Sequence, residues 1–202
     1  MELPESALGV PLSIQRVPLC PELRLQLVSA EANLDAPLAS LWDLPSAPYW
    51  AFCWGAGQAL ARHLLDHPER VRGARVVDFG AGSGVAAIAA ARAGAHQVVA
   101  VDVDPLAHAA CRVNAALNGV DLGTRFDLPD DWDVLLAADV LYEPYNLPRL
   151  EAWAAPGRRT LMAVPERAGT PRVSWPLLAR VNARTHPDVD PPVDTTRIHT
   201  SP

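Results

Sequence analysis

The sequence contains no lysine: all 17 basic residues among its 202 residues are arginine. A nucleotide-binding P-loop uses a lysine to hold phosphates, so this absence excludes that class of site. Cysteine is scarce as well, and Cys20, Cys53 and Cys111 share no spacing typical of a metal site. We therefore expect three reduced, buried cysteines that pack as small apolar side chains, with no disulfide and no metal centre.

The charge balance and the hydropathy argue against further classes of partner. The formal net charge is −6 and the sequence pI is near 5.4, which disfavours bulk attraction to nucleic acid or to an anionic membrane. No apolar run approaches the length of a membrane span, and residues 1–5 do not resemble a signal peptide. We expect a cytoplasmic, single-domain monomer whose partners are neither nucleic acid nor membrane.

What the sequence does contain is a glycine-rich turn between a buried strand and a helix. The apolar run 75–79 is followed by Gly80, Gly82 and Gly84, and Asp102 ends the next apolar run. Glycines let the backbone come close to a ligand, and the helix that follows offers free N–H groups. An acid at the end of the next strand suits the two hydroxyls of a ribose. The pattern therefore predicts an adenosine-containing cofactor.

Two cofactors fit this pattern. Residues 82–87 match a relaxed dinucleotide-binding motif, with Asp102 at a suitable distance, which favours an NAD-type oxidoreductase. S-adenosylmethionine (SAM) differs because its methionine end carries an ammonium and a sulfonium. Asp78, just before the glycines, would repel a pyrophosphate but attract an ammonium. Asp78 therefore favours SAM, and the NAD-type oxidoreductase stays the alternative.

The hydrophobic pattern predicts alternating strands and helices after a proline-rich start. The expected strands lie at 75–79, 97–101, 122–126, 133–138 and 160–164. The expected helices lie at 55–66, 84–93, 105–117 and 147–154. In the tail we expect a short helix at 175–179 and strands at 181–185 and 195–199. Such alternation is typical of an α/β fold with a doubly wound, mostly parallel sheet.

Four stretches resemble one enzyme family: 48–62, 76–84, 102–105 with 114–119, and 139–142. In order and spacing they resemble class I SAM-dependent methyltransferases, most closely the lysine methyltransferases of the electron-transfer flavoprotein β subunit and their bacterial relatives. The resemblance implies a Rossmann-like, seven-stranded sheet of order 3-2-1-4-5-7-6 with the last strand antiparallel. It places a methyltransferase domain at 49–202 and leaves 1–48, with an alternating strand at 23–28, as an extension packing on the core.

Two stretches depart from the family pattern. Relatives carry an Asp-Pro-Gly-Arg-like turn after the fifth strand, where this chain has 164–167, Val-Pro-Glu-Arg. Relatives also tend to end in an aromatic-containing strand, where this chain has 196–199, Thr-Arg-Ile-His. Both departures fall where substrate would be recognised, so they bear on the substrate more than on the cofactor.

The resemblance implies a set of cofactor-binding residues: Trp54, Gly57, Asp78, Gly80, Gly82, Gly84 and Asp102. The four acids at 127–133 are typical of a solvated loop, and in the alternative interpretation Asp127 is the one that would reach the adenine amino group. Asp139 and Tyr142 would face the accepting nitrogen, Asp139 by aiming the amine and receiving its proton, Tyr142 as an aromatic wall. The structural alternatives are that Asp139 caps a strand, that Tyr142 packs, and that the alternating aromatics at 50–54 form a strand face.

Methyl transfer requires a neutral amine as the nucleophile. A free lysine has a pKa near 10.4, so presenting it neutral at pH 7 costs about 4–5 kcal/mol. A desolvating aromatic pocket lowers that pKa, whereas Asp139 alone would raise it. We expect a SAM-dependent N-methyltransferase acting on a lysine of a cytosolic protein, such as the electron-transfer flavoprotein β subunit. A small-molecule N-methyltransferase and a binder without activity remain as alternatives.

Overall fold

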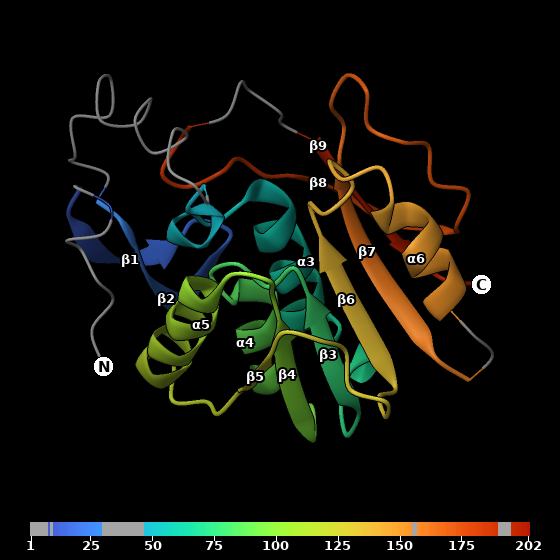
Figure 1. Cartoon of the computed structure of the whole chain (residues 1–202), viewed down its shortest axis with the longest axis horizontal. Helices are drawn as coiled ribbons and strands as arrows, with labels where there is room; N and C mark the ends of the chain where they lie inside the picture. The colour runs from blue at the N-terminus through green and yellow to red at the C-terminus, as the bar shows by residue number, and fades with distance from the viewer. Residues whose placement is uncertain (1–7, 9, 30–46, 155–156, 190–194) are drawn as a thin grey trace.

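A seven-stranded sheet forms the centre of the molecule (Figure 1). The computed structural model describes residues 8, 10–29, 47–154, 157–189 and 195–202. In spatial order the strands are β5 (Gly123–Arg125), β4 (Gln97–Val101), β3 (Arg75–Phe79), β6 (Val134–Ala138), β7 (Arg159–Pro165), β9 (Thr195–Thr200) and β8 (Leu177–Asn182). The first five run parallel, and β9 lies antiparallel between β7 and β8. The α/β class and the predicted order 3-2-1-4-5-7-6 are confirmed.

Helices cover both faces of this sheet, as a doubly wound fold requires. They are α3 (Gly55–Asp66), α4 (Val85–Arg92), α5 (Pro105–Leu117) and α6 (Asn146–Trp153), and Figure 1 shows α6 on the face opposite the other three. Successive strand residues point to opposite faces. Val76 accordingly joins the core beneath α3 and α4, while Val77 joins the second core with Leu150 of α6.

A two-stranded hairpin, β1 (Leu12–Val17) and β2 (Cys20–Val28), packs against the face that carries α3 and α4. The alternating residues Leu23, Leu25 and Leu27 are fully buried in the same core as these helices. The predicted strand at 23–28 is therefore confirmed as part of a longer hairpin. The domain boundary after residue 48 stays a prediction, and residues 30–46 lie outside the described part.

The tail and the aromatic stretch differ from expectation. The predicted helix at 175–179 is wrong, because β8 begins at Leu177 and pairs along its length with β9. Pairing with a neighbouring strand overrides the weak local pattern of this short segment. The alternating aromatics do not form a strand face either, since Tyr49–Ala51 is a 3₁₀ turn that buries Trp50.

The three cysteines are free and buried, as predicted. Burial raises the pKa of the Cys20 thiol to about 12, so this thiol is inert at neutral pH. The described residues hold no group of three side chains able to bind a metal ion. Among the same residues, no helix has the length and apolar character needed to span a bilayer.

Candidate cofactor and acceptor site

The glycine turn, residues 80–84, joins β3 to α4 in a conformation that only glycine adopts easily. Gly80, Gly82 and Gly84 have φ angles of 71°, 51° and 82°, all in the left-handed region. Space is short as well: a Cβ at Gly80 would lie 2.7 Å from Cγ1 of Val140, and one at Gly84 would lie 3.0 Å from Sγ of Cys111. The turn therefore brings bare backbone to the carboxyl edge of the sheet, where open α/β sheets bind ligands.

Asp78 lies on β3 directly ahead of this turn and is 2% exposed. Its Oδ2 accepts a hydrogen bond of 3.0 Å from the backbone N–H of Ala87, in the first turns of α4. Burial raises the pKa of the Asp78 carboxyl to about 7, and the nearby charge of Asp102 adds to this effect. A cation brought to this carboxyl would favour its ionised form.

Asp102 follows β4 and holds the glycine turn in place. Its Oδ2 accepts from the N–H of Gly82 at 2.9 Å, and its Oδ1 accepts from the N–H of Asp104 at 3.0 Å. A carboxylate offers about four acceptor positions, so two remain for the hydroxyls of a ribose. Asp104 in turn caps α5 by accepting from the N–H of Leu106, as its position before Pro105 predicts.

Two apolar side chains missed by the sequence analysis stand exposed beside Asp102. Val103 is 87% exposed at the end of β4, and Phe126 is 57% exposed at the end of the neighbouring β5. The Phe126 ring lies against His108, with centroids 4.4 Å apart. The exposed Asp127 follows Phe126. An apolar residue between Asp102 and Asp104, and an aromatic directly after a strand, are the signals that could have identified this surface.

Asp139 directly follows β6 and has a left-handed backbone conformation with a φ of 56°. Its carboxylate receives two parallel hydrogen bonds from Arg167, Nη1 to Oδ1 at 3.2 Å and Nη2 to Oδ2 at 3.0 Å. The Asp139 side chain is 10% exposed and that of Arg167 is 30% exposed. Asp139 therefore forms a partly buried, bidentate ion pair, and does not simply cap the strand.

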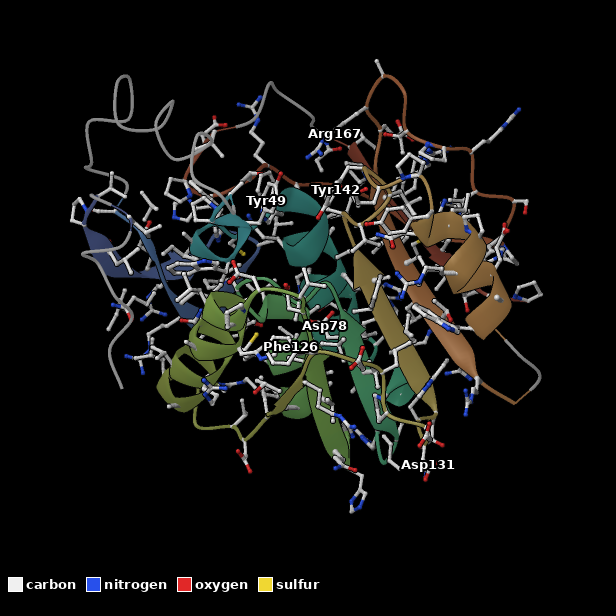
Figure 2. The ribbon with its side chains drawn as sticks, in the orientation of Figure 1. Tyr49, Asp78, Phe126, Asp131, Tyr142 and Arg167 are labelled. Atoms are coloured by element: carbon white, nitrogen blue, oxygen red, sulfur yellow. The ribbon has the colours of Figure 1, made fainter. Side chains whose placement is uncertain are left out.

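An aromatic cluster of Tyr49, Trp54 and Tyr142 stands beside this ion pair. The Tyr49 ring lies 5.7 Å from Trp54 and 5.8 Å from Tyr142, between ring centroids, and the Trp54 indole N–H donates to the Tyr49 carbonyl. Figure 2 shows Tyr49, Tyr142 and Arg167 toward the same upper edge of the sheet, above Asp78. Partial burial raises the pKa of Tyr142 to about 12, with Tyr49 and nearby acids adding, so Tyr142 stays a neutral phenol.

The chain is similar in sequence and in fold to known methyltransferases. Residues 58–142, which carry the glycine turn, Asp102, Asp139 and Tyr142, match a family model described as ribosomal protein L11 methyltransferase (PrmA). The electron-transfer flavoprotein β-subunit lysine methyltransferase of Rattus norvegicus is 38% identical over 163 residues, or 74% of this chain and 62% of that protein. The Xenopus laevis protein of the same name is 38% identical over 164 residues, or 75% of this chain and 65% of that protein.

The chain is a relative of these lysine methyltransferases. It spans less than two thirds of the length of either relative. The fold is also that of the ribosomal protein L11 methylase from Lactobacillus delbrueckii subsp. bulgaricus, with a TM-score of 0.50, 22% identity and coverage of 73% of this chain and 79% of that one. The chain therefore has the class I methyltransferase fold.

Within this methyltransferase fold, Gly57 has a packing role. A Cβ at Gly57 would lie 2.9 Å from Cγ1 of Val85, because α3 and α4 pass closely at this point. Packing accounts for this glycine, and its contact with a cofactor stays a prediction. Gly55 is similar, since a Cβ there would lie 2.6 Å from the carbonyl oxygen of Ala183.

Three of the four acids at 127–133 belong to the opposite end of the sheet. Asp131 and Asp133 form ion pairs with Arg75, which begins β3, and Figure 2 shows Asp131 at the lower edge, far from Tyr142. The Arg75 guanidinium holds the pKa of Asp133 well below its usual range. Asp130 belongs to the same end, because its carbonyl oxygen accepts from Arg158, which directly precedes β7. These acids are structural, which leaves Asp127 as the acid of this stretch closest in sequence to the end of β5.

Two buried amides, which were not singled out from the sequence, tie the core helices to the hairpin and to the segments before and after them in the chain. Asn114 of α5 donates to the Ser83 carbonyl of the glycine turn at 2.9 Å and accepts from the Gln26 N–H of β2 at 2.7 Å. Gln58 of α3 donates to the Cys53 and Arg184 carbonyls at 3.1 and 2.6 Å. A fully buried amide on an otherwise apolar helix face is the signal that could have identified them.

Proposed function

We propose that this chain is a SAM-dependent methyltransferase that modifies a lysine side chain of a protein. One observation carries the proposal. A glycine turn between two acids, Asp78 and Asp102, shares an edge of the sheet with an acidic and aromatic acceptor site formed by Asp139 and Tyr142. The glycine turn with Asp78 and Asp102, here called the cofactor cradle, would suit many enzymes. The acceptor site beside it suits an amine.

The residues at the cradle fit SAM. Burial raises the pKa of the Asp78 carboxyl, so an ammonium beside it would stabilise its ionised form. The Asp102 carboxylate can accept hydrogen bonds from ribose hydroxyls. Val103 and Phe126 offer an apolar surface for a purine, with Asp127 beside it. When bound, SAM supplies an electrophilic methyl group on a sulfonium. A dinucleotide would instead set a pyrophosphate against Asp78, which disfavours the oxidoreductase alternative.

The acceptor residues suit a lysine side chain. The aromatic cluster offers π faces to a cation, while Asp139 supplies an oriented acceptor for an amine N–H. Tyr142, a neutral phenol, does not serve as the base. The names of the relatives point to the electron-transfer flavoprotein β subunit as the first substrate to try.

A ligand panel tests the cofactor. We expect S-adenosylhomocysteine and SAM to raise the melting temperature of the chain at saturating concentration, because a ligand that binds only the folded state stabilises it. NAD and NADP should leave it unchanged. Stabilisation by NAD alone would refute the methyltransferase assignment.

Transfer of label from methyl-labelled SAM tests the reaction. The purified electron-transfer flavoprotein β subunit and a bacterial lysate serve as acceptors, and we expect labelled lysine. Asp139→Asn should lower the rate by at least tenfold, because an amide cannot hold Arg167 with two oxygens and so no longer orients the amine. Asp121→Asn, at an exposed acid after α5, is the matched control and should act as wild type. Equal labelling by both variants would remove Asp139 from the reaction.

A further inference from the structure

The bidentate contact between Asp139 and Arg167 has a consequence for the acceptor amine. Arg167 stands in the turn after β7, in the stretch 164–167 that departs from the family pattern, and both its Nη atoms donate to Asp139. An arginine is charged at any physiological pH, so the pair is neutral as a whole. Partial burial of both side chains makes the pair stronger than an exposed one.

Among the described residues, the titratable groups that act on Tyr142 beside this pair are acids and one phenol. Glu143 follows Tyr142 on the same loop, Tyr49 faces Tyr142 from the 3₁₀ turn, and Asp102 also lies close enough to act on Tyr142. Glu166 precedes Arg167 but is engaged with Arg197 at 3.3 Å and with Arg180 at 3.7 Å. Without Arg167, an amine at this edge would face an Asp139 carboxylate that has lost its bidentate counter-charge, which favours the ammonium form.

The accepting nitrogen must be neutral for the reaction to balance. An ammonium has no lone pair, so its proton must leave to solvent before the N–C bond forms. The N–C bond then forms as the C–S bond breaks, the positive charge moves from sulfur to nitrogen, and a neutral thioether departs. Any group that raises the pKa of the bound amine therefore slows the reaction at neutral pH.

We propose that Arg167 is a positioning residue that keeps the acceptor amine deprotonated. Its guanidinium cancels the charge of Asp139, which would otherwise hold the amine as an ammonium. The two hydrogen bonds from the Arg167 guanidinium fix the orientation of the Asp139 carboxylate, which in turn orients the amine. This inference rests on the proposed function and deepens it, because it assigns how the same site selects a neutral lysine.

The pH dependence of kcat tests the inference, because kcat reports groups in the enzyme–substrate complex. The probe is the protein that the wild type labels, at saturating SAM. For Arg167→Gln we expect the pH at which kcat rises to increase by about one unit. At pH 7 the kcat of this variant should be roughly tenfold below that of wild type, and the difference should become smaller at alkaline pH. Arg167→Lys keeps the positive charge and should keep the wild-type pH profile of kcat. Its rate should be lower at every pH, because a lysine cannot make the two parallel hydrogen bonds of the guanidinium.

Matched controls distinguish a shift in the pH profile of kcat from a general loss of folded protein. Arg180→Gln removes an exposed arginine paired with Glu166 and should leave the profile unchanged. Affinity for S-adenosylhomocysteine should be the same in all variants. If Arg167→Gln does not fold, the pH profile of kcat for Arg167→Lys tests the inference instead. A shift of that profile from the wild-type profile would overturn the inference.

The possible failures are distinguishable. A loss equal at every pH in Arg167→Gln would mean that Arg167 only supports the structure, and a faster rate would mean that it blocks the site. Either result overturns the inference and leaves the proposed function standing. Absence of transfer by the wild type itself would refute both together.

Discussion

Phe126 and Val103 show how single exposed side chains mark the site. Each is a large apolar residue at the end of a strand that borders Asp102, and burial does not explain either one. Exposed apolar residues that gather at a ligand-binding edge are more informative than exposed residues scattered singly. We interpret the pair as the surface that receives the flat ring of an adenosine.

Phe126→Ala should weaken the binding of S-adenosylhomocysteine by about tenfold or more, because stacking of a base on an aromatic ring contributes roughly 1–3 kcal/mol. Stability should change little, since the ring is more than half exposed. Isothermal titration calorimetry measures the affinity. Tyr145→Ala is the matched control, with a ring 56% exposed outside the cradle. Equal losses in both variants would refute a specific contact with adenine.

At the scale of elements, backbone conformation favours glycine at all three glycines of the turn, and at Gly80 and Gly84 space requires it as well. Gly84 begins α4 with a φ of 82° and lies over Cys111 of α5. Gly73 has a similar φ of 72°, but a Cβ there would meet nothing within 4 Å. Alanine substitutions at these two positions therefore separate the loss of stability due to the left-handed conformation from the loss due to steric overlap.

Gly73→Ala should lower the free energy of unfolding by about 1 kcal/mol, because alanine is strained in the left-handed conformation. Gly84→Ala should cost roughly 2–4 kcal/mol, because the added methyl must also displace Cys111 in a closely packed interior. It should also weaken S-adenosylhomocysteine binding, whereas Gly73→Ala should not. Urea unfolding followed by tryptophan fluorescence measures both stabilities. Similar costs at the two positions would contradict this account of the turn.

The elements that surround the glycine turn were predictable because their signals are local. β3 and β4 are short buried apolar runs, and α5 has Asp104 and Pro105 at its start, so chain position alone places them. β8 was not predictable, because its pairing with β9 decides its structure. The ion pair of Asp139 with Arg167 depends on two turns brought together by β6 and β7, which no local pattern encodes.

For the whole molecule, the buried carboxyl of Asp78 links stability to pH. Its pKa in the folded chain is about 7, against an ordinary value of 3.8. The folded state therefore keeps a proton that the unfolded state releases, and stability falls as pH rises from about 4 to about 7. The free protein carries a cost at neutral pH that a cationic ligand would offset, a pattern typical of functional sites.

Asp78→Asn should remove this cost, because its amide oxygen can still accept from the N–H of Ala87 and carries no charge. We expect the variant to gain melting temperature relative to wild type as pH rises from 5 to 8. Differential scanning calorimetry at several pH values measures the difference. A difference that stays constant across this range would show that Asp78 does not titrate there.

The central claim is that Asp78 recognises the ammonium of the cofactor at the glycine turn. Calorimetric titration with S-adenosylhomocysteine and with adenosine, which lacks the amino-acid part, tests it most directly at pH 8. The account predicts that wild type binds S-adenosylhomocysteine much more tightly than adenosine, and that Asp78→Asn loses most of this preference while binding adenosine as before. Equal affinity of wild type for the two ligands, or an unchanged preference in Asp78→Asn, would contradict it.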